Sequence, residues 1–543
     1  MLTCQYIAKF LKNRGVKQVF GTPGSDTINL INAFSEEGIR YILTHHENTA
    51  AYMASTYGEI TGIPGVVIVT KGPGVTNITS GIAAAYLDRR PIIVFSAILD
   101  PELLARNPHQ EVALVPFCGL ISKLSEEITS ENVVELIERA YSLSLESRPG
   151  AVYLPISPVQ SVAEVNMSDD EAIEIINKTV SIKDTLVPDI SVALELISKA
   201  KRPLTLVGVS VVGTNTSKEA VAFIEKLQSP ACVTLQAVGQ IPCDNKYYMG
   251  MYGWFGTPID KMMKEADLII TVGLDGWDII RPFKSEVPIL SIDSVDANDR
   301  TFQPVTNGLV GDIGKILSLL CNGIKDDRDL EWGADEAHSC YDRIHNYELT
   351  VSKEHSEVNG IAPQDVYKEI RKITPNDTII AADAGAHKSL ASQAWESYGP
   401  KGYFVSNGLS PMGFSIGAAM GAKLAEPDKV VISFVGDGGF LMYAGELATW
   451  ARLNIPMIQV VMVDHSLTQV KSKQEKQGFN TEATSFQAID YCAIARSMGI
   501  HGVSVNNKAA LRKAILDAID KNIPTTIEVI LDGDEYLRMP SAV

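Results

Sequence analysis

Residues 430–440 read VVISFVGDGGF, and residues 457–466 read MIQVVMVDHS. Each stretch is an apolar run, typical of a buried parallel strand, and each run is followed by an aspartate. A helix-like stretch separates the two runs, so they predict neighbouring parallel strands whose carboxyl ends meet at one edge of a sheet. Open α/β sheets bind ligands at that edge, which makes Asp437 and Asp464 candidate ligand-binding residues.

Magnesium is the ligand that best suits this pair of acidic residues. Mg²⁺ binds one or two carboxylates together with the phosphates of a substrate. The glycines that flank Asp437 let backbone N–H groups approach such phosphates closely. The two stretches therefore predict a magnesium and diphosphate site. The alternative for both aspartates is a turn or cap role, because Asp is common in both places.

Similar apolar runs, separated by helical patterns, occur along the rest of the chain. The expected strands cover residues 65–70, 91–95, 151–155, 203–207, 232–235, 268–272, 289–292, 378–383 and 525–530. This alternation predicts an α/β protein with doubly wound parallel sheets. We expect three such domains, at residues 1–165, 187–324 and 355–543. The acidic residues 163–186 and the charged residues 325–354 are expected to be linkers.

The composition limits the class of protein. In 543 residues, 47 Lys and Arg stand against 65 Asp and Glu, and the net charge of −18 argues against nucleic acid or an anionic membrane as a partner. We find neither a signal-type core nor an apolar run long enough to span a membrane. The 7 cysteines form no CxxC pair, which disfavours zinc and fits free thiols in a reducing compartment. We expect a cytoplasmic protein.

The two aspartates, 27 positions apart, are part of a wider resemblance. Together with His46-Glu47-Asn48, the GPGxxN-like loop at 72–77 and the stretch at 407–414, they resemble the thiamine diphosphate (ThDP) enzymes of the acetolactate synthase and pyruvate decarboxylase superfamily. The motifs stand in the family's order and the resemblance covers essentially the whole chain. It implies pyrimidine-binding, central and diphosphate-binding domains. It also implies a homodimer or homotetramer with active sites at the subunit interface.

The resemblance implies a role for each motif. Glu47 would hydrogen-bond the pyrimidine ring of ThDP and activate the cofactor, and Met412 would hold it in a bent shape. Asp437, Asp464 and the backbone carbonyl of Ser466 would hold Mg²⁺. The other residues implied in cofactor binding are Pro73, Asn77, Gly385, His387, Ser410, Gly438, Gly439, Leu467 and Val470. Taken singly, Met412 would be assigned to the core, as most methionines are, and only the neighbouring motifs favour its role at the cofactor.

His109 and Gln110 lie where the family places residues that face the reacting carbon. Pyruvate decarboxylases carry two histidines there, whereas this chain has one histidine followed by Gln. That difference favours a carboligase pocket, with Gln110 and His109 as catalytic candidates. The alternative is a polar loop without a catalytic role.

Three positions depart from the FAD-containing biosynthetic acetolactate synthases. Asp275 stands in place of an arginine expected near FAD, and an acid there would repel the FAD diphosphate. We therefore expect no FAD. Lys473 falls where a tryptophan sizes the acceptor pocket, and Asp464 stands where asparagine is commoner. Branched-chain amino-acid synthesis is thus not the expected role.

The prediction is a homo-oligomeric enzyme that depends on ThDP and Mg²⁺. It would decarboxylate a small 2-oxo acid, with pyruvate as the first candidate. It would then join the remaining fragment to a second carbonyl compound, as in acetolactate synthesis. The alternatives are a simple decarboxylase that releases an aldehyde, an acyltransferase, and a homologue without catalytic activity.

Overall fold

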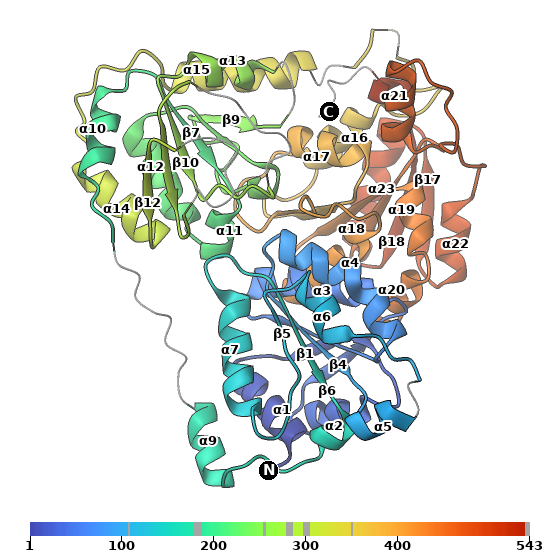
Figure 1. Ribbon diagram of the computed structural model, residues 1–543. Helices are drawn as coiled ribbons and strands as arrows, with labels where there is room; N and C mark the ends of the chain where they lie inside the picture. The colour runs from blue at the N-terminus through green and yellow to red at the C-terminus, as the bar shows by residue number, and fades with distance from the viewer. Residues whose placement is uncertain are drawn as a thin grey trace. The chain divides into compact units, whose positions relative to one another are not determined.

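The computed structural model describes residues 1–106, 109–177, 187–253, 257–278, 286–296, 305–348, 351–353 and 355–537. Within these residues, three six-stranded sheets form the framework (Figure 1). Neighbouring strands are parallel throughout, including β15 (Val431–Gly436) and β16 (Ile458–Val463), where Phe434 lies opposite Val460. The predicted α/β class with three parallel sheets is confirmed. So is the prediction that the two opening runs are neighbouring parallel strands.

The first sheet has the strand order β2-β1-β3-β4-β6-β5. Its strands are β1 (Gln18–Thr22), β2 (Arg40–Leu43), β3 (Gly65–Val69), β4 (Ile92–Ala97), β5 (Leu124–Ser125) and β6 (Ala151–Ile156). The helices of this part are α1 (Thr3–Asn13), α2 (Ile28–Glu36), α3 (Glu47–Thr61), α4 (Pro73–Leu87), α5 (Pro101–Arg106), α6 (Leu114–Gly119), α7 (Val133–Leu145), α8 (Pro158–Ser161) and α9 (Asp169–Asn177). Every residue of β3 and β4 is buried, as expected of strands covered on both faces.

The second sheet has the order β12-β11-β10-β7-β8-β9. Its strands are β7 (Pro203–Val207), β8 (Ala231–Val233), β9 (Tyr248–Met251), β10 (Leu268–Val272), β11 (Ile289–Asp293) and β12 (Asn307–Val310). The helices around it are α10 (Ser191–Lys199), α11 (Ser210–Thr214), α12 (Ser217–Leu227), α13 (Pro258–Glu265), α14 (Ile313–Gly323) and α15 (Ala334–Arg343), with short turns η1 (Leu235–Ala237) and η3 (Ile344–Glu348). The bounds of β7 and β10 are those predicted from the apolar runs.

The third sheet has the order β14-β13-β15-β16-β18-β17. Beside β15 and β16 it contains β13 (Ile379–Ala382), β14 (Tyr403–Val405), β17 (His501–Val505) and β18 (Thr525–Ile530). The helices of this region are α16 (Pro363–Arg371), α17 (Ala386–Ala394), α18 (Phe414–Ala425), α19 (Asp437–Met442), α20 (Glu446–Leu453), α21 (Thr468–Lys476), α22 (Tyr491–Ser497), α23 (Lys508–Lys521) and α24 (Asp534–Leu537). This sheet places the predicted metal motif at the carboxyl ends of its two central strands.

The chain divides into two compact units that do not follow its linear order. The first contains Met1–Lys183, Gly413–Asp428 and Tyr443–Ile455, and the second contains Asp184–Met412, Lys429–Met442 and Pro456–Val543. Helices α18 and α20 therefore belong with the first sheet. In that unit α18 packs closely on α3, where a Cβ atom at Gly421 would lie 2.3 Å from the backbone oxygen of Met53. The two helices thus meet almost backbone to backbone.

Both segments predicted as linkers contain helices, so that prediction is partly wrong. Within 163–186 the structure has α9, whose Ala172 and Ile176 are buried in the core of the first unit. Within 325–354 it has α15, whose Ala337 and Cys340 are buried in the central domain. Each helix buries only a narrow stripe, and its many charged residues hide that pattern in the sequence. Residues 178–186 lie outside the described residues.

Candidate active site

The two aspartates of the opening stretches lie at adjacent strand ends in the second unit. Asp437 is the first residue of α19, directly after β15, and Asp464 directly follows β16. Both line a cavity of about 250 Å³. The side chain of Asp437 is 3% exposed, so its charge is held away from water. The sheet edge therefore carries two close carboxylates in a buried hollow.

All the residues of the predicted C-terminal domain that the resemblance implies in cofactor binding line this one cavity. They are Gly385, His387, Ser410, Met412, Asp437, Gly438, Gly439, Asp464, Ser466, Leu467 and Val470. Because Ala384, Gly385 and Ala386 also line it, the amino end of α17 opens onto the hollow. Helix amino ends favour anions, so this wall of the cavity suits a phosphate group.

The glycines after Asp437 are required by close packing. A Cβ atom at Gly438 would lie 2.9 Å from Met412 Cε and 3.3 Å from Leu467 Cδ2. A Cβ atom at Gly439 would lie 2.2 Å from a carboxylate oxygen of Asp383. The contact with Asp383 is too short for a side chain at Gly439, whereas a side chain at Gly438 would displace the end of the Met412 side chain. Because Gly438 and Gly439 have no side chains, their backbone groups are open to the cavity.

The electrostatics of the cavity call for a cation. Burial, and then the charge of Asp464, raises the pKa of Asp437 to about 7, and burial also raises the pKa of Asp464. Neighbouring groups partly stabilise the ionised form of Asp464, because its carboxylate accepts hydrogen bonds from the Thr468 hydroxyl and the Ser466 N–H. Two buried carboxylates that repel each other are stabilised when a divalent ion lies between them.

Three side-chain polar atoms of residues that line this cavity have no hydrogen-bond partner among the described residues. They are Asp437 Oδ2, an acceptor, His387 Nε2 and the hydroxyl of Tyr536. Burial, and then the neighbouring Lys388, lowers the pKa of His387 to about 4, so the imidazole is neutral near pH 7. A carboxylate oxygen suits Mg²⁺ and a ring nitrogen can meet a phosphate oxygen. The residues present therefore fit a magnesium diphosphate group.

The raised pKa of Asp437 predicts how Mg²⁺ binding depends on pH. A carboxyl group whose folded-state pKa lies above its ordinary value of 3.8 makes the metal-free protein less stable as pH rises toward about 7. Mg²⁺ binds the ionised form, so it has to displace protons at low pH. We expect the rise in Tm caused by Mg²⁺ to be small at pH 5 and clearly larger at pH 8, as measured by scanning fluorimetry against EDTA. Equal shifts at both pH values would contradict this assignment.

The first unit holds Glu47 at the start of α3. His46 caps this helix by accepting the N–H of Asn48 on its Nδ1. Glu47 is 7% exposed, and its Oε2 accepts a hydrogen bond of 3.1 Å from Asn77 Nδ2 in α4. The helix start is fixed further by Glu446, whose Oε1 accepts the N–H groups of His45 and His46. The result is a buried, rigidly held carboxylate at the carboxyl edge of the first sheet.

The loop before α4 lies against the turn that contains Gln110. Gly72 has φ +57°, and a Cβ atom there would lie 2.7 Å from the backbone oxygen of Gln110. Pro73 follows as the first residue of α4. His109 and Gln110 are both exposed, and the preceding residues 107 and 108 lie outside the described part. The structure thus brings Gln110 to the glycine loop that leads to Asn77, while His109 sits in the same turn.

Some residues of the cavity were missed from the sequence. Lys388 and Thr468 line it without belonging to any predicted motif. Lys388 Nζ donates to Ser410 Oγ at 2.6 Å and to the carbonyl of Ser406 at 3.2 Å. Ser410 has φ +60°, so this buried lysine braces a turn in an uncommon conformation. Only the place of Lys388 directly after His387 could have drawn attention to it.

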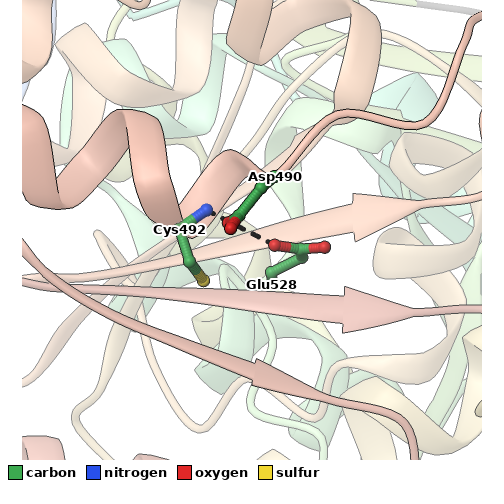
Figure 2. Close-up of side chains that lie close together, drawn as sticks. All are labelled: Asp490, Cys492 and Glu528. Atoms are coloured by element: carbon green, nitrogen blue, oxygen red, sulfur yellow. Dashed lines mark hydrogen bonds between the residues drawn. The ribbon is translucent and has the colours of Figure 1, made fainter.

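A second group of acidic and thiol side chains lies away from this cavity. Figure 2 shows Asp490, Cys492 and Glu528, whose possible ligand atoms lie within 4.8 Å of one another. Asp490 caps α22 by accepting the N–H of Ala493, and Glu528 accepts the N–H of Cys492 at 3.3 Å. Burial raises the pKa of Cys492 to about 12, so the thiol stays protonated and is a poor metal ligand. We assign these contacts to local structure.

Comparison with known proteins covers nearly the whole chain. Profiles of thiamine pyrophosphate enzymes match in three parts: the N-terminal TPP binding domain at residues 1–115, the central domain at 190–320 and the C-terminal TPP binding domain at 383–529. An acetolactate synthase large subunit of Lactococcus lactis is 31% identical over 98% of this chain and 93% of that protein. An acetolactate synthase of Bacillus subtilis is 29% identical over 99% of this chain and 94% of that protein.

A solved structure shares the fold. The thiamine diphosphate-dependent 4-hydroxybenzoylformate decarboxylase of Rhodococcus jostii superposes with a TM-score of 0.84, covering 98% of this chain and 100% of that chain at 21% identity. Within the residues that the structure describes, no helix is both long and apolar enough to cross a membrane.

Sheet, cavity and profiles together define a ThDP-dependent enzyme, of the class that contains carboligases and decarboxylases. The chain belongs to the ThDP enzyme superfamily that includes the acetolactate synthases, which confirms the resemblance drawn from its motifs.

Proposed function

We propose that this enzyme decarboxylates a small 2-oxo acid, with pyruvate as the first candidate, and joins the remaining fragment to a second carbonyl compound. The similarity to acetolactate synthases over nearly the full length of the chain supports this reaction. The observation that carries the proposal is the cavity with Asp437 and Asp464 at adjacent strand ends, beside the amino end of α17. That arrangement suits a diphosphate cofactor with its metal.

In this proposal the residues of the cavity bind and orient the cofactor. Asp437, Asp464 and the Ser466 carbonyl hold Mg²⁺, while the glycine turn and His387 hold the diphosphate. Met412 lies against Gly438, and its side chain holds the cofactor in the bent shape. When bound, ThDP supplies a carbon nucleophile and an electron sink for decarboxylation. The protein's own task is positioning, together with the exclusion of water from the hollow.

Residues of the first unit of a second copy would act at the other end of the cofactor. The buried Glu47 would hydrogen-bond the pyrimidine ring of ThDP, and its carboxyl group would exchange a proton with the ring nitrogen. Asn77 keeps that carboxylate in place through the hydrogen bond at 3.1 Å. Gln110 and His109 are the substrate-side candidates, because their turn contacts the glycine loop before α4. A side-chain amide can hold a carbonyl oxygen without protonating it, which favours carboligation over aldehyde release.

Neither FAD nor nucleic acid is part of the proposed function. Asp275 is fully buried after β10 and accepts the N–H of Trp277 at 3.1 Å, so an acidic residue lies at the carboxyl edge of the central sheet. An acidic residue at this place opposes a dinucleotide diphosphate. The net charge of −18 opposes nucleic acid. The enzyme is proposed to act in the cytoplasm as a homodimer or homotetramer, with each active site built from two copies of the chain.

The reaction is tested by analysing the products formed from pyruvate. With ThDP and Mg²⁺ present, we expect carbon dioxide release together with acetolactate or acetoin. The control is the same protein in EDTA without added ThDP, which should give neither product. Acetaldehyde as the sole organic product would identify a simple decarboxylase. Acyl phosphate that forms only when phosphate is added would identify an acyltransferase, and either result would overturn the carboligase proposal.

A further inference from the structure

Tyr536 lines the cavity from α24, the short helix that follows β18. Its ring is half-buried and packs against the core that holds the third sheet. The hydroxyl at its tip is enclosed and has no hydrogen-bond partner in the described part of the chain. The residue lines the same hollow as Asp437, Asp464 and Ser466. A buried hydroxyl without a hydrogen-bond partner destabilises the folded protein. The position of the Tyr536 hydroxyl therefore calls for an explanation.

Another tyrosine beside the cavity shows the ordinary solution. Tyr367 is fully buried, and its hydroxyl donates a hydrogen bond of 3.0 Å to the backbone carbonyl of His387. The protein itself thus provides the hydrogen-bond partner of the Tyr367 hydroxyl, and this bond holds the first turn of α17 in place. Tyr536 makes no comparable bond, although it lies close enough to the two aspartates to feel their charge. The contrast indicates that the Tyr536 hydroxyl is directed at something other than the protein.

The unpartnered atoms of the cavity identify the chemistry of that missing partner. Asp437 Oδ2 needs a positive charge or a donor, whereas Tyr536 Oη needs an acceptor. The two do not bond to each other, so one ligand has to offer both kinds of surface. A magnesium ion with attached phosphate oxygens does so, because its metal suits the carboxylate and its oxygens suit the hydroxyl.

The Tyr536 hydroxyl is available as a donor across the physiological pH range. Burial, and then the charges around it, including those of Asp464 and Asp437, raises its pKa well above the ordinary value of 10.0. The phenol therefore keeps its proton next to two acidic groups. The uncharged hydroxyl does not repel a phosphate group, and it does not attract other anions from bulk solvent.

We propose that Tyr536 is a positioning residue whose hydroxyl donates a hydrogen bond to a phosphate oxygen of the magnesium diphosphate group in this cavity. The inference rests on the proposed function, since it takes ThDP to bind there. It deepens that function by giving the C-terminal segment a direct role in cofactor binding.

The test compares Tyr536→Phe with the wild-type protein by isothermal titration calorimetry of ThDP in excess Mg²⁺. A hydrogen bond to a charged oxygen contributes about 1.5–3 kcal/mol, so we expect Kd to rise about 10- to 100-fold. Tyr6→Phe is the matched control, because it removes another buried hydroxyl without a partner among the described residues, in α1 of the first unit. That control should leave Kd unchanged.

A second titration separates two oxygens that the hydroxyl could meet. If it meets a phosphate oxygen, the affinity of Tyr536→Phe for Mg²⁺ alone equals that of the wild type. An equal loss of affinity for Mg²⁺ alone would place the hydroxyl on a metal-bound water and overturn the proposal as stated. Unchanged ThDP binding by Tyr536→Phe would also overturn it. Wild-type protein that binds no ThDP would instead refute the proposed function.

A direct measurement covers the case in which the variant does not fold. In a crystal structure of the wild-type protein with ThDP and Mg²⁺, Tyr536 Oη should lie within about 3.0 Å of a phosphate oxygen. A separation well beyond hydrogen-bond distance, with ThDP bound, would refute the inference and leave the cofactor assignment intact.

Discussion

Glu47→Gln should lower kcat for pyruvate by about 10²- to 10⁴-fold, which is the range of a lost general acid–base group. Gln has nearly the same shape and can still accept the hydrogen bond from Asn77 that holds Glu47 at 3.1 Å. It cannot carry the negative charge that stabilises the activated pyrimidine ring. The variant should therefore fold and bind ThDP normally while losing turnover. Carbon dioxide release and calorimetric ThDP binding measure the two effects separately.

Glu135→Gln is a suitable control for this experiment. Glu135 is exposed on α7 in the same unit, and the change removes the same charge without touching α3. Its kcat should match that of the wild type. Undiminished turnover in Glu47→Gln would refute the assigned role of Glu47. A loss of ThDP binding as large as the loss of turnover would show that Glu47 binds the cofactor without activating it.

The strands could be predicted well because parallel sheets are buried on both faces. Such strands appear in the sequence as short apolar runs, and β18 begins and ends at the predicted residues 525 and 530. The stretch at 72–77 was described as a loop, whereas helix α4 begins inside it, at Pro73. Proline is favoured in the first turn of a helix, where its missing N–H costs nothing, and that signal was available. Helices α9 and α15 were missed because their short buried stripes are outnumbered by charged residues.

The candidate site was predictable only where a motif marks it. The Asp437 turn and the Asp464 loop could be found because an aspartate directly after a buried parallel strand lies at the ligand-binding edge of the sheet. Tyr536 and Lys388 could not be found in this way. Their importance depends on a hydroxyl and an ammonium group that the fold carries to the cavity from separate elements. Tyrosine and lysine are ordinary surface residues in a sequence, so only their burial beside the aspartates distinguishes them.

Asp437→Asn should have opposite effects on cofactor binding and on the stability of the metal-free protein. The change removes one charge from the proposed metal site, and breaking a buried charge interaction costs about 3–5 kcal/mol. Binding of ThDP with Mg²⁺ should therefore weaken by about 10²- to 10³-fold or more. Without metal, however, the ionised Asp437 destabilises the fold, since burial and Asp464 raise its pKa to about 7. At pH 8 the metal-free variant should be more stable than the wild type, by no more than about 4 kcal/mol.

Urea unfolding in EDTA at pH 8 and at pH 5 measures the stability effect. The gain should fall to less than half at pH 5, where the folded carboxyl group keeps its proton, and it should vanish only below the ordinary value of 3.8, where the unfolded group is protonated as well. Asp517→Asn is the control, because Asp517 lies in the exposed ion pair with Lys513 on α23. It should change neither ThDP binding nor the pH dependence of stability. A variant that is less stable at pH 8 without metal would contradict the raised pKa of Asp437.

The two inactive variants together also test how the active site is assembled. If Glu47 of one chain serves the metal site of another, a dimer of Glu47→Gln with Asp437→Asn contains one intact site and one doubly defective site. Random pairing of the two co-expressed chains should then restore about one quarter of wild-type activity. If both residues serve the same chain's site, every site in the mixture is defective and no activity returns. Differently tagged chains allow the mixed dimer to be purified, which raises the expected value to about one half.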